Sequence, residues 1–331
     1  MKKILAVILT IAVVFTLTAC GSGGGATGGS GGQASSNTSG GSGGSDNKTI
    51  VVLLKNLTNP FWVDVKKGAE KAGADFGYNV KVVAPVIADN NEEQIQLLEQ
   101  ELLNPPAAFV IAPADSMGIA PAVEQINQLK IPVINLNTRI TAEGLDIVTF
   151  VATDNIEVGK VTMEALAEKM GGKGNVVIIT GVPGQQNSID RRDGALQAIE
   201  NYPDITVVDE QIANWNREES MKVTQDLLQK HAQIDGIFAV NGEMAIGSSE
   251  AVRQAGKTGQ VKIAGIDVFE EVINRIKNGD VTITNDGVSQ TQGYNAVKAA
   301  IDVIEGKQVD PRIRIPTKIV DESNAGEYTF S

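Results

Sequence analysis

The two tryptophans of this 331-residue chain stand outside its apolar runs, in positions where a side chain could contact a ligand. Trp62 follows Phe61 shortly after the apolar run at 49–54, and Trp215 lies in the polar motif NWN. Aromatic residues make up only 4% of the chain. Where a strand passes into a helix, an aromatic ring can offer its flat apolar face to a small molecule. These placements predict a binding surface with aromatic walls.

Polar and charged side chains stand at comparable corners of the chain. The candidate ligand-binding residues are Asn59, Phe61, Trp62, Asn137, Arg139, Arg191, Trp215, Asn241, Asp267 and Asp286. This combination suits a sugar, because sugar C–H faces stack on aromatic rings while the hydroxyls need paired donors and acceptors. Structural roles are the alternative: Asn59, Asn241 and Asp267 could cap helices, and the aromatic residues could pack in the core. The pattern leaves open whether Arg191 or its neighbour Arg192 faces the ligand.

The sequence gives only weak indications of a catalytic site. The only histidine, His231, ends a helical pattern, where a surface or helix-terminal role is expected. A pair such as Asp267 with Asp286 could serve a glycosidase, but each carboxylate has a simpler role in binding hydroxyls. The sequence contains no Walker motif, GxSxG, HExxH or cluster with metal-ligand spacing. We therefore predict a binding protein without catalytic residues, cofactor or metal.

The elements that must position these residues follow an alternating pattern. Short apolar, β-branched runs occur at 49–54, 79–84, 107–113, 131–136, 175–180, 205–210, 236–241 and 261–267. Helical patterns such as 91–104 and 218–231 lie between them, with apolar residues at three- and four-residue spacing. Buried parallel strands joined by crossover helices are typical of this pattern, so we predict a doubly wound α/β architecture.

The chain also repeats itself at a period of about 125 to 130 residues, longer than a solenoid repeat. KKGAEKA around Gly68 matches RDGALQA around Gly194, and the helical pattern before 107–113 matches the one before 236–241. This predicts two similar lobes in succession. Ligands of such proteins bind at strand carboxyl ends and between domains, so the corner residues of both lobes should line one cleft.

The ends of the chain and its charge limit the other possibilities. Residues 1–20 have the layout of an export leader ending in LTAC, which resembles a lipobox with Cys20 as the lipidated residue. Residues 21–47 are a glycine- and serine-rich linker. Because Cys20 is the only cysteine, an internal disulfide is excluded. The net charge of −12 argues against a nucleic-acid surface, which needs a basic footprint.

An ordered set of motifs carries a family resemblance. NPFW, FVATDN, SIDRRDGALQAI, VNGEMAIGSSEAV and IAGID together resemble the ribose- and galactose-type periplasmic sugar-binding proteins of bacterial ABC transporters. The resemblance implies three hinge strands near 150–154, 283–287 and 314–320. It also implies a first lobe of 48–152 plus 288–316 and a second lobe of 153–287 plus 317–331.

Two departures from the family pattern concern the ligand. An Asp-Arg pair of the family is Asn137-Thr138 here, and a hinge glutamine of the ribose binders is Gly287, beside Asp286. These changes alter which hydroxyl pattern can be satisfied, and an unsatisfied buried polar group costs about 1 to 3 kcal/mol. Ribose is therefore not the first ligand that the sequence predicts.

The resemblance implies a function outside the cytoplasm. We expect a lipid-anchored protein on the outer face of the cytoplasmic membrane, or in a periplasm, that captures a monosaccharide and delivers it to an ABC permease. A polyol or cyclitol is the alternative ligand, and a surface receptor that feeds a sensor system is the alternative role. The ligand-sensing domain of a repressor is disfavoured, because an export leader stands where a helix-turn-helix would be.

Overall fold

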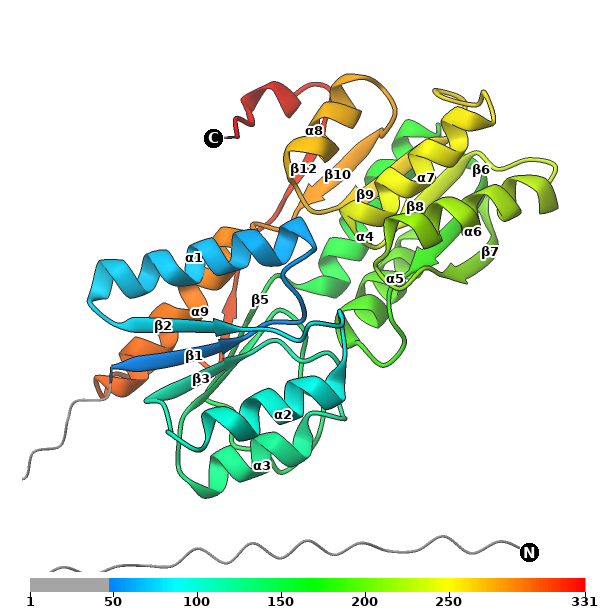
Figure 1. Cartoon of the computed structure of the whole chain (residues 1–331). Helices are drawn as coiled ribbons and strands as arrows, with labels where there is room; N and C mark the ends of the chain where they lie inside the picture. The colour runs from blue at the N-terminus through cyan, green and yellow to red at the C-terminus, as the bar shows by residue number, and fades with distance from the viewer. Residues whose placement is uncertain (1–47, 331) are drawn as a thin grey trace, which may run out of the picture. The chain divides into compact units, whose positions relative to one another are not determined.

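The computed structural model describes residues 48–330, which form two lobes, each built on a six-stranded sheet flanked by helices (Figure 1). The predicted leader (1–20), the linker (21–47) and Cys20 lie outside the described residues. The prediction of two similar doubly wound α/β lobes is confirmed.

The first lobe has the strand order β11-β5-β4-β3-β1-β2. Its strands are β1 (Thr49–Leu53), β2 (Asn79–Val83), β3 (Ala108–Ile111), β4 (Val133–Leu136), β5 (Thr149–Ala152) and β11 (Arg312–Arg314). Its helices are α1 (Pro60–Phe76), α2 (Asn91–Glu101), α3 (Ala120–Gln128) and α9 (Ser289–Ile304). All the pairings in this sheet are parallel.

The second lobe repeats the plan with the order β12-β10-β9-β8-β6-β7. Its strands are β6 (Lys173–Thr180), β7 (Asp204–Ile212), β8 (Gly236–Ala239), β9 (Lys262–Ile266), β10 (Ile283–Asp286) and β12 (Lys318–Asp321). Its helices are α4 (Asn155–Lys169), α5 (Gln186–Ile199), α6 (Arg217–Lys230), α7 (Gly242–Gln254) and α8 (Glu270–Lys277), with a 3₁₀ turn at Ala325–Glu327.

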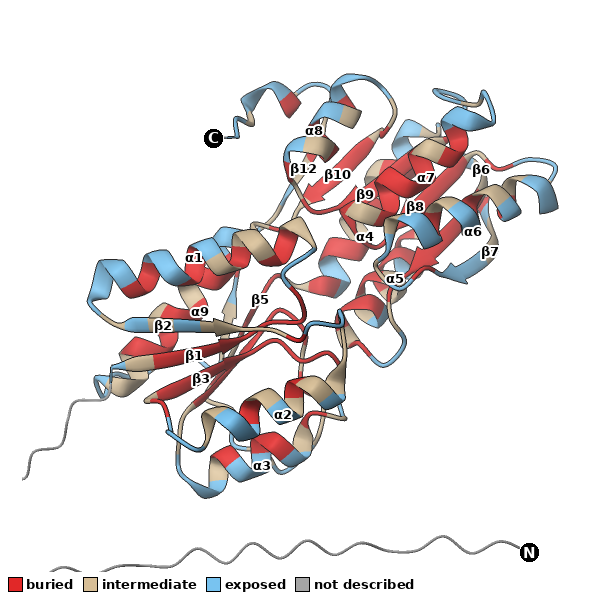
Figure 2. Cartoon of the chain, viewed as in Figure 1, coloured by how far each residue is buried: buried red, intermediate tan, exposed pale blue. Residues whose placement is uncertain are grey.

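Alternation along a buried strand explains how each sheet holds helices on both faces. In β1, Ile50 and Val52 join the core beneath α1 and α9, whereas Val51 and Leu53 join the core beneath α2 and α3. Successive side chains of a strand point to opposite faces, so an uninterrupted apolar run serves two helical layers at once. Figure 2 shows these inner strands as buried, with exposed residues on the outer sides of the helices.

The chain passes between the lobes three times. It leaves the first lobe after β5, returns after β10 to form α9, and crosses again between β11 and β12. The predicted three-strand hinge is therefore confirmed. One pairing departs from the parallel plan: β12 runs antiparallel to β10. The reason is the direction of travel, because β10 runs into a crossing and β12 runs out of one.

Among the described residues, no helix combines the length and the apolar character needed to cross a membrane.

Candidate functional site

The carboxyl ends of the strands of both lobes meet around one cavity of about 350 Å³, counting its opening to solvent. From the first lobe it is lined by Lys55, Asn56, Asn59, Phe61, Trp62, Asp89 and Asn137, and from the second by Asn187, Arg191, Trp215, Asn241 and Asp267. Eight of the ten residues that the sequence nominated are in this set.

Three aromatic side chains form the walls. Phe61 and Trp62 lie in the first turn of α1, with ring centroids 5.0 Å apart and planes at 89°. Both are buried and pack on the first-lobe core, so the core alternative is realised at two residues that also line the cavity. Trp215 comes from the second lobe, and Gly181 leaves space for it: a Cβ there would lie 2.2 Å from the indole.

Lys55, which was not among the predicted ligand-binding residues, lies between these walls. Its Nζ lies 5.7 Å from the ring centroid of Trp62 and 5.8 Å from that of Trp215, and it donates to Gln185 Oε1. The side chain is fully buried, and this burial lowers the pKa of Lys55 to about 7, although Asp89 opposes the shift. A lysine directly after a buried apolar strand could have revealed the position, since strand carboxyl ends face the crevice.

Arg191 and Asp267 bring a second pair of opposite charges to the cavity. Arg191 donates from Nε to Asn155 Oδ1 at 2.9 Å and from Nη1 to the Val240 carbonyl at 2.8 Å, and its burial lowers its pKa. Burial raises the pKa of Asp267 to about 7, while the Arg191 charge acts in the opposite direction. Arg192 instead ion-pairs with Asp193 and Glu210 on the surface. Of the two adjacent arginines, Arg191 is therefore the one at the cavity.

Two buried acceptors at the cavity have no hydrogen-bond donor among residues 48–330. They are Oδ1 of Asp267 and Oδ1 of Asn187. Asp267 uses only its other oxygen, which accepts from the Gly242 N–H at 3.4 Å. Buried polar atoms are normally paired, so these two atoms provide places for the hydroxyl donors of a ligand.

The asparagines between the strands and the following helices also have structural roles. Asn59 caps α1 by accepting from the Phe61 N–H, and Asn241 caps α7 by accepting from the Met244 N–H. Asn56 Oδ1 accepts from the N–H groups of Thr58 and Asn59 and so shapes the turn into α1. The capping alternative is thus realised at Asn59 and Asn241, which it holds at the edge of the cavity, whereas Asp267 does not cap α8, whose N-cap residue is Phe269.

Backbone strain is concentrated here. Four of the lining residues have positive φ: Asp89 at 59°, Asn137 at 58°, Trp215 at 61° and Asp267 at 102°. Asn and Asp tolerate this region, but a bulky residue such as Trp215 is an outlier there. Strain of this kind persists where surrounding contacts over-determine it, which is common at ligand sites.

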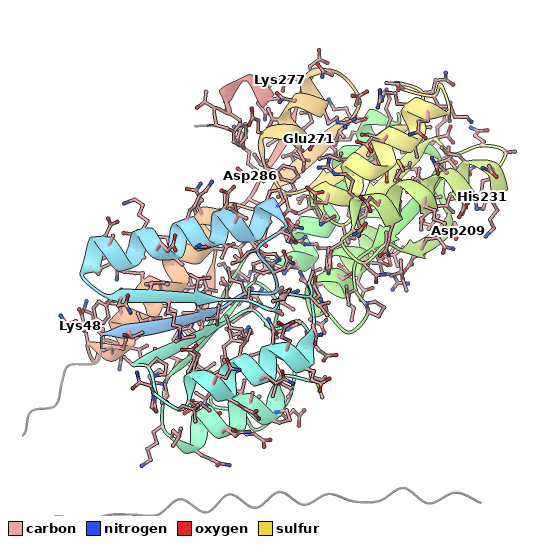
Figure 3. The ribbon with its side chains drawn as sticks, viewed as in Figure 1. Lys48, Asp209, His231, Glu271, Lys277 and Asp286 are labelled. Atoms are coloured by element: carbon pink, nitrogen blue, oxygen red, sulfur yellow. The ribbon has the colours of Figure 1, made fainter. Side chains whose placement is uncertain are left out.

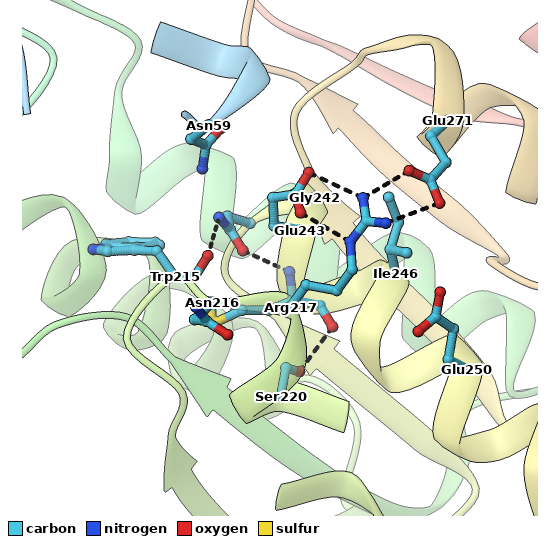
Figure 4. Close-up of polar contacts among 12 residues, drawn as sticks. Asn59, Trp215, Asn216, Arg217, Ser220, Gly242, Glu243, Ile246, Glu250 and Glu271 are labelled. Carbon is cyan, nitrogen blue, oxygen red and sulfur yellow. Dashed lines mark hydrogen bonds and ion pairs between the residues drawn. The ribbon is translucent and has the colours of Figure 1, made fainter. Parts of the chain in front are cut away.

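Polar contacts at the start of α6 and α7 hold the loop that carries Trp215 (Figure 4). Asn241 Nδ2 reaches the Trp215 carbonyl at 3.5 Å. Arg217 forks between Glu243 and Glu271, with closest contacts of 2.9 and 2.7 Å. These bonds tie the Trp215 loop to the rest of the second lobe.

Two nominated residues do not line the cavity. Arg139 lies outside it, with Nη2 3.5 Å from Asp190 Oδ2 of the second lobe. Asp286 accepts from the Tyr328 hydroxyl at 3.0 Å and from the Val288 N–H. In Figure 3 its label lies where α1 approaches the second lobe. The sequence placed both residues at the correct strand ends, but it could not give the direction of their side chains.

Four lining residues were missed: Lys55, Asn56, Asp89 and Asn187. Asp89 and Asn187 carried no sequence signal, because they lie in polar segments with many similar neighbours. His231 pairs with Asp209 at 2.7 Å at the outer end of the second lobe, away from the cavity (Figure 3). No group of potential metal ligands occurs within the described residues.

Comparison with known proteins assigns this chain to a family. A model described as "Periplasmic binding protein domain" matches residues 50–308. The chain belongs to the periplasmic binding protein family. The family model describes a periplasmic binding domain, and the relatives reported below are named as binding proteins, so the predictions that this protein is no enzyme and is extracytoplasmic are confirmed.

Individual relatives cover most of the chain. The D-allose-binding periplasmic protein of Escherichia coli (strain K12) is 32% identical over 277 residues, covering 82% of this chain and 89% of the relative. The ribose import binding protein RbsB of Bacillus subtilis (strain 168) is 32% identical over 324 residues, covering 96% and 99%. A periplasmic solute-binding protein from Actinobacillus succinogenes 130z, solved with bound D-allose, has a TM-score of 0.81 and 32% identity, covering 85% and 99%.

Proposed function

We propose that this protein captures a neutral monosaccharide between its lobes and delivers it to the permease of an ABC transporter. The observation that carries the proposal is the pair of buried, unpartnered acceptors on Asp267 and Asn187 in a cavity walled by aromatic rings. Hydroxyl donors from a sugar would satisfy the acceptors, and its C–H faces would stack on the rings.

The charge of the cavity favours a neutral ligand. Lys55 and Arg191 are matched by Asp89 and Asp267, so the lining has two basic and two acidic side chains, whose formal charges cancel. A sugar acid would add a buried charge with no free counterion, which is costly in a desolvated site. A neutral sugar requires only hydrogen bonds.

D-Allose is the first candidate ligand and D-ribose the second. The relatives support both, because one is named for D-allose, one for ribose, and a similar structure holds D-allose. We assign stacking to Phe61, Trp62 and Trp215, and hydrogen bonding to the polar lining residues. A polyol or cyclitol is the alternative ligand class.

Binding would couple to movement of the lobes. The lining comes from both lobes, and the three crossings between β5 and α4, β10 and α9, and β11 and β12 act as the hinge. A ligand that contacts both walls stabilises the arrangement in which the walls are close. We propose that the permease recognises this arrangement.

The test is a thermal-shift screen of the purified protein against neutral monosaccharides, sugar acids, polyols and cyclitols, with tryptophan fluorescence recorded in the same samples. A true ligand at a hundred times its dissociation constant should add about 2.7 kcal/mol, or about 5 °C in Tm. We expect a stabilising hit among the neutral monosaccharides, with a change in fluorescence. Stabilisation by sugar acids alone would contradict the charge argument, and no response to any sugar, polyol or cyclitol would contradict the function.

We further propose that Cys20 carries a lipid that anchors the protein to the outer face of the cytoplasmic membrane. The support is the leader-like sequence before Cys20 and the glycine- and serine-rich composition of residues 21–47. Cells fed a labelled fatty acid should incorporate label into the wild type and not into a Cys20→Ser variant. Label of equal intensity in both proteins would exclude this anchor.

Transport rather than sensing is the proposed use of the captured sugar. Deletion of the gene should abolish uptake of the radiolabelled sugar identified in the screen, and expression of the wild-type chain should restore it. If uptake persists while a sugar-induced transcriptional response is lost, the sensor alternative is correct.

A further inference from the structure

Gln185 makes three side-chain hydrogen bonds although it does not line the ligand cavity. Its Oε1 accepts from Lys55 Nζ and, at 2.9 Å, from Trp215 Nε1, while its Nε2 donates to Asp89 Oδ1 at 2.8 Å. The residue is fully buried. Gln185 belongs to the second lobe, as does Trp215, whereas Lys55 and Asp89 belong to the first. The amide of Gln185 therefore bonds to side chains of both lobes.

The place of Gln185 in its own lobe makes this use of the side chain notable. It is the N-cap residue of α5, yet its side chain makes no capping bond. At the corresponding corners Asn59, Asn216 and Asn241 do cap α1, α6 and α7. Ser, Thr, Asp and Asn are preferred at this position, and capping stabilises a helix by about 1 kcal/mol. The amide of Gln185 instead bonds to cavity-lining residues of both lobes.

All three partners of Gln185 line the cavity. Lys55 depends on this amide most, because its buried ammonium needs an acceptor. The groups facing that ammonium are the Gln185 amide, the rings of Trp62 and Trp215, and the charges of Asp89 and Arg191. Removal of Gln185 would leave Lys55 without its hydrogen-bond partner and Trp215 without its anchor.

We propose that Gln185 is a positioning residue that locks the first-lobe cation Lys55 and the second-lobe ring Trp215 into one ligand-binding arrangement. The proposal rests on the proposed function in one respect, since it assumes that these two side chains hold the sugar. It extends that function by naming the contact, the Gln185 amide, that connects a binding residue of the first lobe to one of the second.

Other hydrogen bonds join the lobes close to Gln185. They allow the effect of Gln185 on Lys55 and Trp215 to be separated from a general effect on lobe closure. The Gln186 N–H donates to Ser116 Oγ at 3.0 Å, and the Ser116 N–H donates to the Gly184 carbonyl at 3.3 Å. Neither bond involves a lining residue. The side chain of Gln186 bonds to Asp190 within α5 at 2.7 Å. Gln186→Leu is therefore a matched control for Gln185→Leu, with the same substitution at the next position.

The first arm of the test uses the full chain without sugar. Trp62 and Trp215 are the only tryptophans, and the Lys55 ammonium lies between them, so its loss of a proton should change their fluorescence. We expect a transition near pH 7 that disappears in Lys55→Met. Its midpoint should fall in Gln185→Leu, which removes the acceptor, and rise in Gln185→Glu, which places a carboxylate beside the ammonium. Gln186→Leu should leave it unchanged.

The second arm measures Kd for D-allose and D-ribose by calorimetry. Gln185→Leu should weaken binding of the better sugar at least tenfold, and Gln186→Leu and Ser116→Ala should weaken it less than threefold. If Gln185→Leu does not fold, Gln185→Glu decides the question through its shifted midpoint.

The inference is overturned if the wild type shows no Lys55-dependent transition, or if neither Gln185 variant moves the midpoint. It is also overturned if Gln185→Leu binds the sugar as the wild type does. A wild type that binds neither sugar but shows the shifts of the first arm would instead contradict the proposed ligand and support the contact network.

Discussion

Buried charge is the dominant property of the cavity at the scale of single residues. Lys55, Arg191 and Asp267 are nearly inaccessible to solvent, and burial shifts the pKa of each toward its neutral form. Strongly perturbed titratable groups in a cleft are typical of functional sites. In this cavity the buried titratable groups suit ligand binding. Hydrogen bonds from a ligand can replace the hydrogen bonds to water that these groups lost on burial.

Asp267 should make the stability of the protein fall with rising pH. Its folded-state pKa of about 7 lies above the unfolded value near 3.8, so the folded state holds the extra proton between these limits. Its stabilising contribution is complete below about pH 4 and is lost as the pH rises through 7. In the wild type this contribution to the free energy of unfolding should be about 2 kcal/mol smaller at pH 7 than at pH 5.

Urea unfolding at pH 5 and pH 7 checks this prediction, with Asp267→Asn as the comparison. The variant has no ionisable group at this position. Its free energy of unfolding should therefore lack the decrease between pH 5 and pH 7 that Asp267 causes, while the changes due to all other groups remain. Identical differences between the two pH values in both proteins would show that Asp267 is not protonated by burial.

Trp215 should contribute to affinity more than to stability. It is only partly buried, it lines the cavity, and its strained φ is of the kind that persists at ligand sites. Trp215→Ala should weaken sugar binding by about 2 kcal/mol, which is about thirtyfold. Isothermal calorimetry measures this, with Phe76→Ala at the exposed end of α1 as the control. Equal affinity in Trp215→Ala and wild type would remove this ring from the site.

At the scale of elements, close helix crossings hold each lobe together. α1 crosses α9 through Gly68 and Gly293, and α4 crosses α5 through Gly159 and Gly194. A Cβ at any of these glycines would lie within about 2.0 Å of a backbone oxygen of the opposite helix. Gly68 and Gly194 are also the centres of the repeated motifs in the sequence. The repeat is thus explained by the same packing requirement in both lobes.

Gly293→Ala should destabilise the first lobe although alanine is the better helix former. Its Cβ would lie 2.0 Å from the Val65 carbonyl oxygen, and this backbone atom cannot move without shifting α1. The overpacking should cost about 1 to 3 kcal/mol, more than the gain in helix propensity. Chemical unfolding measures it, with Gly326→Ala as the control because a Cβ there meets open space. An increase in stability for Gly293→Ala would refute the close crossing.

At the scale of the whole described region, two lobes of one plan use corresponding corners to build a single site. Direct bonds already span the cleft, including Gln185 to Asp89 and Arg139 to Asp190. The three crossings are the covalent links between the lobes in residues 48–330. Rotation about them would change the distance between the cleft rims while leaving each lobe intact.

Sugar should therefore bring the rims closer. Val86, shortly after β2 in the first lobe, and Ile212, at the end of β7 in the second, are exposed and lie at strand carboxyl ends, so a Cys20→Ser chain carrying Val86→Cys and Ile212→Cys can be labelled with two dyes. Energy transfer should rise when the sugar found in the screen is added. Labels at Val86→Cys and Leu103→Cys, both in the first lobe, should show no change. An equal response from both pairs would contradict hinge closure.

The sequence by itself determined the class of the fold, because buried β-branched runs and helical periodicity depend on local chemistry. It also determined the duplication and most corner residues, since the carboxyl ends of parallel strands always open on the ligand crevice. Asn59, Trp62 and Asp267 could be nominated for this reason.

Tertiary structure alone decided which side chains meet. It turned Arg191 inward and Arg192 outward, left Arg139 and Asp286 outside the cavity, and brought Lys55 between the two indoles. It also placed Gln185, 130 positions from Lys55, within bonding distance of that lysine. Local patterns cannot contain this information, because side-chain direction and cross-lobe contact depend on how both sheets twist and how the hinge sets them face to face.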